Sequence, residues 1–182
     1  MDRPERKPMR LKNYDYSAPG AYFLTICTYD RQQCLSTIVT VESESRGTAV
    51  GALHEAPAVC HTLTPEEECV RRSTESTSAR WPGVSVDRYV IMPNHVHMLV
   101  RIHEDRSIRE STLQGNGKRS LISKVIGYLK MTSSRDVHDF RPGPLWQRSY
   151  YDHVIRNEAE YAEIAEYIGA NPARWGSDRF FV

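Results

Sequence analysis

The chain has 182 residues, a formal net charge of +1 and 26% charged residues, which is the composition of an ordinary globular protein. This length suits one domain, residues 1–182, and no apolar run reaches the length of a membrane span. The first residues lack the apolar core of a signal peptide, so we expect a cytoplasmic protein. The four cysteines show no Cys-x-x-Cys spacing, which argues against a zinc cluster, and a reducing compartment argues against a disulfide framework.

Charge is distributed unevenly along the chain, although its sum is close to zero. Residues 3–12 are basic, the middle of the chain is acidic, and a second basic stretch runs from residue 106 to residue 130. Such a distribution permits a local phosphate-binding face, but a solvated surface is the commoner explanation. The basic residues of the second stretch are Arg106, Arg109, Lys118, Arg119, Lys124 and Lys130.

The first half of the chain is predicted to contain three strands and a helix. β-Branched and aromatic residues favour strands over 21–28, 34–41 and, as a short edge strand, 58–63. Thr64 then has the position of a helix N-cap, and Glu67 stands where a capping box requires it. The sequence therefore predicts a helix that ends near residue 78.

The second half continues the alternation of strands and helices. Residues 84–92 and 95–102 are predicted to pair across a tight turn at Pro93 and Asn94. A polar loop follows, and Ser120 then has the position of a helix N-cap. The remaining predicted elements are a strand over 145–155 and a helix that follows Asn157 and ends near residue 170.

The resulting order β, β, α, β, β, α, β, α predicts an α+β domain. A mostly antiparallel sheet with helices packed on it is the expected architecture for this order. Residues 1–20 are expected to be extended and peripheral because they contain several breakers, and residues 173–182 are expected at the periphery as well.

His95 and His97 lie two residues apart in the apolar strand predicted over 95–102. Side chains two apart on a strand point to the same face, so the two imidazoles are expected side by side. Such a pair is half of a metal site, but it is equally compatible with histidines that bond to polar neighbours. The turn at Pro93 and Asn94 favours the metal site because it fixes where the pair begins.

The last predicted helix carries two faces. Tyr167 lies on a polar face with Asn171, four residues further on, and packing does not require a tyrosine there. Spacing alone still makes it an ordinary half-exposed tyrosine. The apolar stripe, which must face the core, comprises Tyr161, Ile164, Ala165 and Ile168.

Three ordered motifs resemble a known family. Residues 92–97 read Met-Pro-Asn-His-Val-His, residues 145–147 read Leu-Trp-Gln, and residues 167–172 read Tyr-Ile-Gly-Ala-Asn-Pro. These motifs resemble those of the IS200-like single-tyrosine transposases, or HUH endonucleases, and most closely the branch associated with repetitive extragenic palindromes (REP). The resemblance spans about residues 10–175.

This resemblance implies a ferredoxin-like fold with His95 and His97 on a central strand and the nucleophile on the C-terminal helix. It implies cleavage and rejoining of single-stranded DNA, in which Tyr167 is the nucleophile and forms a 5′-phosphotyrosine. His95, His97 and Asn171 would bind a divalent cation, Mg²⁺ or Mn²⁺. The phenol needs help to ionise because its ordinary pKa is near 10.

The implied substrate is single-stranded DNA with hairpin structure, and both a monomer and a homodimer stay open. The basic residues between 106 and 130 could track its phosphates. Trp146, Tyr150 and Tyr151 could stack on bases, but core packing is the expected use of at least two of them.

Two other functions stay open at this point. A non-cleaving DNA-hairpin-binding protein of the same fold would need neither the histidine pair nor Tyr167. A metal-dependent oxygenase with a His-x-His pair on a β-barrel would need a carboxylate ligand nearby and more strands than the sequence predicts.

Overall fold

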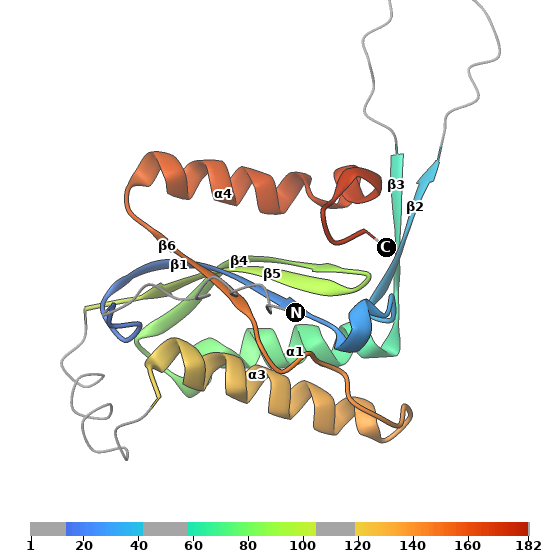
Figure 1. The fold of residues 1–182 in the computed structure, drawn as a ribbon, viewed down its shortest axis with the longest axis horizontal. Helices are drawn as coiled ribbons and strands as arrows, with labels where there is room; N and C mark the ends of the chain where they lie inside the picture. Colours follow the sequence, from blue (N-terminus) through green and yellow to red (C-terminus); the bar gives the residue numbers. More distant parts are fainter. Residues whose placement is uncertain (1–13, 42–57, 105–118, 182) are drawn as a thin grey trace, which may run out of the picture.

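A four-stranded antiparallel sheet forms the centre of the computed structural model, which describes residues 14–41, 58–104 and 119–181. Its spatial order is β4-β5-β1-β6. Two helices cover one face of this sheet and a third covers the other (Figure 1). The strands are β1 (Gly20–Cys27), β4 (Val84–Met92), β5 (His95–Ile102) and β6 (Tyr151–Ile155), and the helices are α1 (Pro65–Arg80), α3 (Leu121–His138) and α4 (Glu158–Ala170).

The connectivity confirms the predicted α+β, ferredoxin-like fold. Strand β1 leads through α1 to the β4–β5 hairpin, and α3 then returns the chain to β6, which pairs with β1. This is the β-α-β-β-α-β arrangement. Helices α1 and α3 pack against each other on one face, whereas α4 lies alone on the opposite face (Figure 1).

Strand β5 is buried on both faces, which explains its nearly continuous apolar sequence. Val96, Met98 and Val100 point into the core beneath α1 and α3, whereas Leu99 belongs to the smaller core beneath α4. Because side chains alternate along a strand, His95 and His97 share the face of Leu99. The register of the hairpin thus places both histidines on the side covered by α4.

A second sheet stands beside the first. It contains β2 (Ser36–Val41) and β3 (Ala58–Leu63), which form a two-stranded antiparallel sheet within the described part of the chain (Figure 1). The sequence predicted both strands, with the first beginning two residues too early. Residues 42–57 lie outside the described residues.

The helix starts follow the predicted capping chemistry. Thr64 Oγ1 accepts from the Glu67 backbone N–H at 3.1 Å, and Asn157 Oδ1 accepts from the Glu160 N–H at 2.9 Å. Ser120 caps α3 in the same way. Helix α1 extends to Arg80, two residues beyond the prediction, and α4 ends at Ala170 as predicted.

The predicted strand over 145–155 is correct only in its second half. Regular pairing with β1 covers Tyr151–Ile155, and Trp146 makes a single bridge to Thr28. Between them, the carbonyls of Gln147 and Ser149 accept from the Lys130 ammonium at 2.7 and 2.8 Å. The Gln147 N–H still donates to the Cys27 carbonyl at 3.0 Å, and regular pairing is interrupted after it, where a side chain of α3 bonds to the carbonyls.

Both expected peripheral segments contribute to the interior. Tyr16 is 5% exposed in the core beneath α1 and α3, and Trp175 and Phe180 are buried near the end of the chain. Within the tail expected at the periphery, Trp175 and Phe180 thus pack inward, while most of the other described residues are exposed. Residues 1–13 and 182 lie outside the described residues.

Helix α4 is held on the sheet by a polar contact as well as by its apolar stripe. Asp87 Oδ2 accepts from the Tyr161 hydroxyl at 2.8 Å and pairs with Arg101 Nε at 3.0 Å. The Arg101 guanidinium also lies 4.6 Å from the centre of the Tyr161 ring. Ile168 is buried one helical turn before Asn171. These contacts fix how α4 is rotated about its axis.

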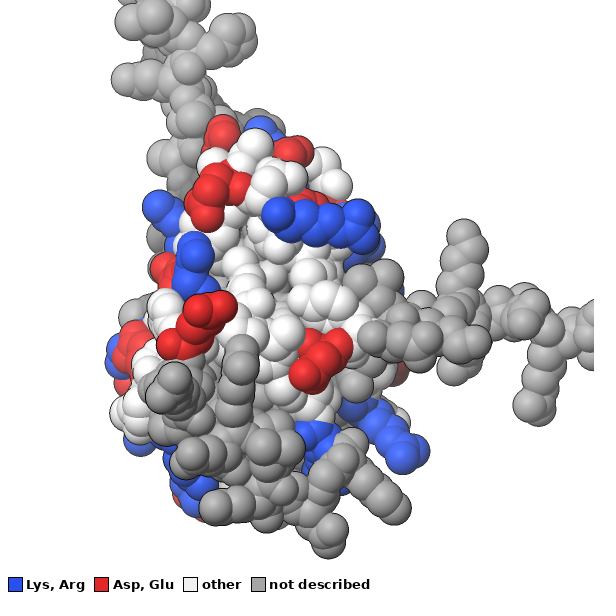
Figure 2. Space-filling view, turned by 90° about the vertical axis from the view of Figure 1, so that its left-hand side faces the viewer, with Lys and Arg blue, Asp and Glu red and all other residues white. Residues whose placement is uncertain are grey.

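Surface charge does not define a binding face at the end of the molecule where α4 begins. Figure 2 shows acidic and basic side chains interspersed over the described surface there. Among the described helices, none has the length and apolar character needed to cross a membrane.

The first prediction concerns Glu67, which is 5% exposed. Burial raises its pKa to about 7, opposed by the positive charge of Arg71. Between the ordinary carboxyl pKa of 4.5 and about 7, the folded protein therefore binds the proton that the unfolded chain has lost, so stability falls as the pH rises. We expect Glu67→Gln, which cannot ionise, to increase the free energy of unfolding at pH 8 by about 1–3 kcal/mol.

Chemical denaturation at pH 4 and pH 8 tests this prediction. At pH 4 the same variant should differ little from wild type, because the carboxyl is then neutral in the folded state. Glu66→Gln, which removes a charge from the same helical turn, serves as the control. Equal effects of Glu67→Gln at both pH values would contradict the prediction.

Candidate active site

Two buried imidazoles form the centre of the candidate site. His95 and His97 are both 0% exposed, and their Nε2 atoms lie 3.1 Å apart on the sheet face covered by α4. The prediction that they share one face of a central strand is confirmed.

Each ring is held by its other nitrogen. Asn94 Nδ2 donates to the Phe180 carbonyl at 2.7 Å, so Asn94 Oδ1 accepts from His95 Nδ1 at 2.9 Å. The Nε2 lone pair of His95 is therefore directed into the site. His97 Nδ1 lies 2.8 Å from Thr25 Oγ1. Contacts of this kind orient histidines that bind metals.

Burial keeps both imidazoles neutral. It lowers the pKa of His95 to about 4, against the nearby charge of Asp178, and it lowers the pKa of His97 well below its ordinary value, with His95 adding to the effect. Neutral imidazole is the form that binds a metal ion. Near pH 7 both histidines are therefore in the ligating form.

Helix α4 brings Tyr167 to this pair. Its hydroxyl lies 3.4 Å from His97 Nε2, and its ring centre lies 5.4 Å from that of His97. Burial raises the pKa of Tyr167, and the negative charge of Asp178 raises it further. The phenol is thus protonated at neutral pH, and its ionisation requires a nearby positive charge or a proton acceptor.

Asn171 reaches the same place one turn later. It is 1% exposed and keeps helical dihedral angles, φ −58° and ψ −43°, although Pro172 follows it. Its Oδ1 is buried without a hydrogen-bond partner. The predicted polar face of α4 thus divides: Glu163 is exposed, while Tyr167 and Asn171 turn toward the sheet.

Asp178 is a site residue that the sequence did not reveal. A short 3₁₀ helix, η2 (Pro172–Ser177), folds the chain back after α4, and Asn171 Nδ2 then lies 3.3 Å from Asp178 Oδ2. One carboxylate oxygen and one nitrogen from each histidine lie within 4.8 Å of one another. No spacing rule connects Asp178 to the histidines. The sequence signal was the presence of two large aromatic residues in the tail, Trp175 and Phe180, which the structure buries against the body of the protein.

These residues fit a divalent cation. Two neutral imidazole nitrogens and a carboxylate are a common ligand set for divalent metals, and an amide oxygen can add to it. The orphaned Asn171 Oδ1 is the more telling observation, because a buried acceptor without a partner is destabilising unless something binds it.

The predicted DNA-contacting residues that the structure describes, Arg119, Lys124 and Lys130, are not brought to this site. Arg106, Arg109 and Lys118 lie outside the described residues. Lys124 and Lys130 belong to α3, which covers the other face of the sheet, and exposed Arg119 precedes that helix (Figure 1). Their role in DNA binding stays a prediction.

Most of the other aromatic residues that the sequence analysis singled out have structural roles. Trp146 is 7% exposed and donates to Ser133 Oγ at 2.9 Å, and Tyr150 packs on the core beneath α3. Tyr161 is bonded to Asp87. Two of the three aromatic residues considered for base stacking thus pack in the core, as expected, and Tyr151 remains 41% exposed.

Comparison with known proteins assigns the family. The family model described as "Transposase IS200 like" matches residues 67–171, which is more than half of the chain and ends at Asn171. The chain belongs to the IS200-like transposase family. A transposase role follows from that membership.

Three individual proteins are similar to the chain. A Haemophilus influenzae protein without an assigned function is 29% identical over 97% of this chain and 93% of its own length. A second protein of that organism, provisionally described as a REP-associated tyrosine transposase, is 24% identical over 91% of this chain and 78% of its own. The solved structure of a REP-associated tyrosine transposase bound to a REP hairpin has the same fold, with a TM-score of 0.56 and 18% identity over 95% of this chain and 75% of that one.

The second prediction separates structural from DNA-contacting lysines. The Lys130 ammonium donates to backbone carbonyls of residues 147–149. We expect Lys130→Met to lower the free energy of unfolding by about 1–3 kcal/mol, because these acceptors lose a charged donor. Lys124→Met, on the same helix, should change it by less than about 0.5 kcal/mol. Denaturant titration measures both values, and an undiminished stability of Lys130→Met would argue for a contact role instead.

Proposed function

We propose that the protein cleaves and rejoins single-stranded DNA with hairpin structure, with Tyr167 as the nucleophile and a divalent cation held by His95 and His97. The observation that carries this proposal is the position of the Tyr167 hydroxyl, 3.4 Å from His97 Nε2, which in turn lies 3.1 Å from His95 Nε2. A half-buried nucleophile beside two neutral, converging ligands suits phosphoryl chemistry.

The residues of this chain would act as follows. The Tyr167 oxygen attacks the phosphorus in line, the new O–P bond forms, and the bond to the 3′-oxygen of the preceding nucleotide breaks. Asp178 Oδ2, 3.5 Å from the Tyr167 hydroxyl, is placed to accept the phenol proton. The departing 3′-oxygen takes up a proton from solvent, and Asp178 later returns the phenol proton to solvent, so the products are a 5′-phosphotyrosine and a 3′-hydroxyl.

Rejoining is the same step in reverse. The 3′-hydroxyl of another DNA end attacks the phosphotyrosine and restores the Tyr167 hydroxyl, so no nucleotide cofactor is needed. When bound, Mg²⁺ or Mn²⁺ would neutralise negative charge on the phosphoryl oxygens. His95 and His97 would hold it, and the third ligand would be Asn171 through its orphaned Oδ1 or Asp178 through its carboxylate.

The hairpin substrate is supported by the fold relative whose structure contains a REP hairpin. The alternative is a protein of this family that binds DNA hairpins without cleaving them. The cleaving and the non-cleaving protein differ in one observable, because only the cleaving protein forms a covalent bond between Tyr167 and DNA.

The third prediction is therefore a tyrosine-linked DNA adduct. Wild-type protein incubated with labelled hairpin oligonucleotides and Mn²⁺ should give a slow, protease-sensitive band on a denaturing gel. Tyr167→Phe should give none, while Tyr150→Phe should keep it. His95→Ala should reduce it by about 100-fold or more. Native binding by all of these proteins without any adduct would support the non-cleaving alternative.

The fourth prediction identifies the third ligand without using activity. Ligand binding to the folded state raises stability with ligand concentration, so Mn²⁺ should raise the melting temperature of the wild type. His95→Ala and His97→Ala should abolish this shift. Of Asp178→Asn and Asn171→Ala, the one that removes the ligand should weaken Mn²⁺ affinity by about 10–100-fold. Full Mn²⁺ stabilisation of His95→Ala would exclude this site as the metal site.

A further inference from the structure

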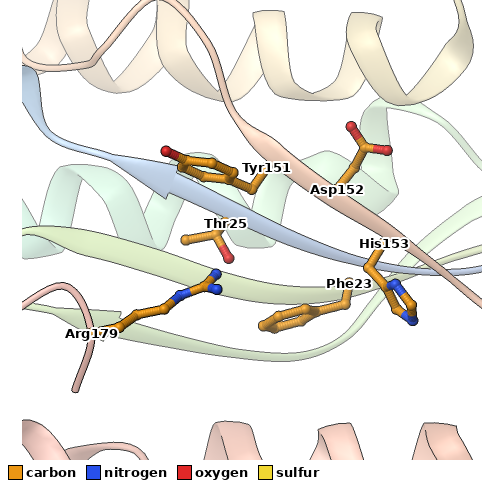
Figure 3. A pocket seen from close by; sticks show the side chains of 6 residues that line it. All are labelled: Phe23, Thr25, Tyr151, Asp152, His153 and Arg179. Atoms are coloured by element: carbon orange, nitrogen blue, oxygen red, sulfur yellow. The ribbon is translucent and has the colours of Figure 1, made fainter. Parts of the chain in front are cut away.

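A pocket beside the candidate active site is not used by the chemistry above. It has a volume of ≈ 380 Å³ and lies where β1 meets the edge strand β6. Figure 3 shows Arg179 extending toward Thr25, which lies between the rings of Phe23 and Tyr151. The pocket is therefore a small recess with two aromatic rings and the cationic Arg179, and its lining is completed by Thr25, Asp152 and His153.

The pocket and the active site share two side chains. Thr25 Oγ1 lies 2.8 Å from His97 Nδ1, so the floor of the pocket is directly behind the histidine pair. The Phe23 ring centre lies 5.1 Å from that of His97 and 6.0 Å from that of Tyr167. A DNA strand whose phosphate meets the Tyr167 hydroxyl would therefore pass its neighbouring nucleotide over this pocket.

Its walls suit a flat ring. Tyr151 pairs with Thr25 in the sheet register, and Phe23 is two residues from Thr25 on the same face, so Phe23 and Tyr151 are diagonal neighbours. Such neighbours are about 7–8 Å apart, so the two rings flank Thr25, and a planar group placed over Thr25 would contact both rings. Tyr151 is 41% exposed and so accessible for stacking.

The remaining features point to a nucleotide. Arg179 is exposed, its guanidinium lies 4.6 Å from the centre of the Phe180 ring, and no carboxylate among the described residues forms an ion pair with it. The pocket is near the lower limit of small-molecule sites, about 300–1,000 Å³, so it fits one nucleotide better than a segment of protein. Aromatic walls with an adjacent cation are the usual platform for single-stranded nucleic acid.

We infer that this pocket receives the base of the unpaired nucleotide next to the cleaved phosphate, between Phe23 and Tyr151, while Arg179 contacts that nucleotide's phosphate. The inference rests on the proposed function, because the adjacent phosphate is the one that Tyr167 attacks. The pocket then holds the strand at one position relative to the nucleophile, and removal of that base should weaken binding.

An abasic scan tests the stacking contact. The cleavage position is first mapped from the product length with wild-type protein. Binding is then measured by fluorescence anisotropy in a Tyr167→Phe background, with hairpin oligonucleotides that each lack one base. One abasic position beside the cleavage position should weaken binding about tenfold or more. Tyr151→Ala should weaken binding of intact DNA by a similar factor. In this variant, the oligonucleotide that lacks the base should bind no more weakly than the intact one.

Matched variants distinguish stacking from a general loss of structure. Tyr151→Phe keeps the ring and should bind as the parent does. Tyr29→Ala removes a tyrosine that is 50% exposed and does not line the pocket, and it should keep the full abasic effect. Melting temperatures establish that the variants are folded.

The phosphate contact has a separate readout. Arg179→Gln should reduce the slope of log affinity against log salt by about 0.7, the contribution of one phosphate in single-stranded DNA. It should weaken binding of intact and abasic oligonucleotides by the same factor. An unchanged slope would overturn the role assigned to Arg179.

The outcomes separate this inference from the proposed function. If wild-type protein forms the Tyr167 adduct but Tyr151→Ala binds and responds to abasic positions as the parent does, the base-binding pocket is wrong and the proposed function stands. Binding without any adduct contradicts the proposed function and removes the adjacency on which the pocket rests. No adduct and no binding to any hairpin overturns both.

Discussion

The structure depends most on the burial of two neutral imidazoles that face each other through Nε2. His95 and His97 are fully buried, and their Nε2 atoms are 3.1 Å apart without a charged partner between them. Asn94 and Thr25 satisfy the other ring nitrogens and so hold the pair in one orientation. A buried polar pair is stable only when each polar atom has a partner. The cation that we propose would be the partner of the two Nε2 atoms.

The same constraint explains why distant parts of the chain meet at one point. Asn94, next to His95 in the hairpin turn, donates to the Phe180 carbonyl, and that contact holds the end of the chain beside β5. On the other side, the contact among Asp87, Arg101 and Tyr161 fixes the rotation of α4 and thereby aims Tyr167 at His97. The candidate site is thus assembled by contacts between elements rather than within one of them.

The set of possible metal ligands also bears on the oxygenase function that the sequence left open. Two histidines and a carboxylate are the ligands that an oxygenase would use, and Asp178 supplies the carboxylate that the sequence did not reveal. The fold is nevertheless a four-stranded antiparallel sheet with packed helices rather than a barrel, and the chain belongs to the IS200-like transposase family. A ligand set alone therefore does not decide the reaction, because the same donors serve several chemistries.

The sequence by itself determined the elements, the shared face of His95 and His97, and the motifs that carry the family resemblance, since strand period and capping are local properties. It did not determine that regular pairing with β1 covers only Tyr151–Ile155, because the carbonyls of Gln147 and Ser149 bond to Lys130 on a separate helix. Nor did it determine that Tyr167 and Asn171 face the sheet, or that Asp178 joins them. Those positions follow from the packing of α4 and from the turn after Pro172, where contacts distant in sequence outweigh local pattern.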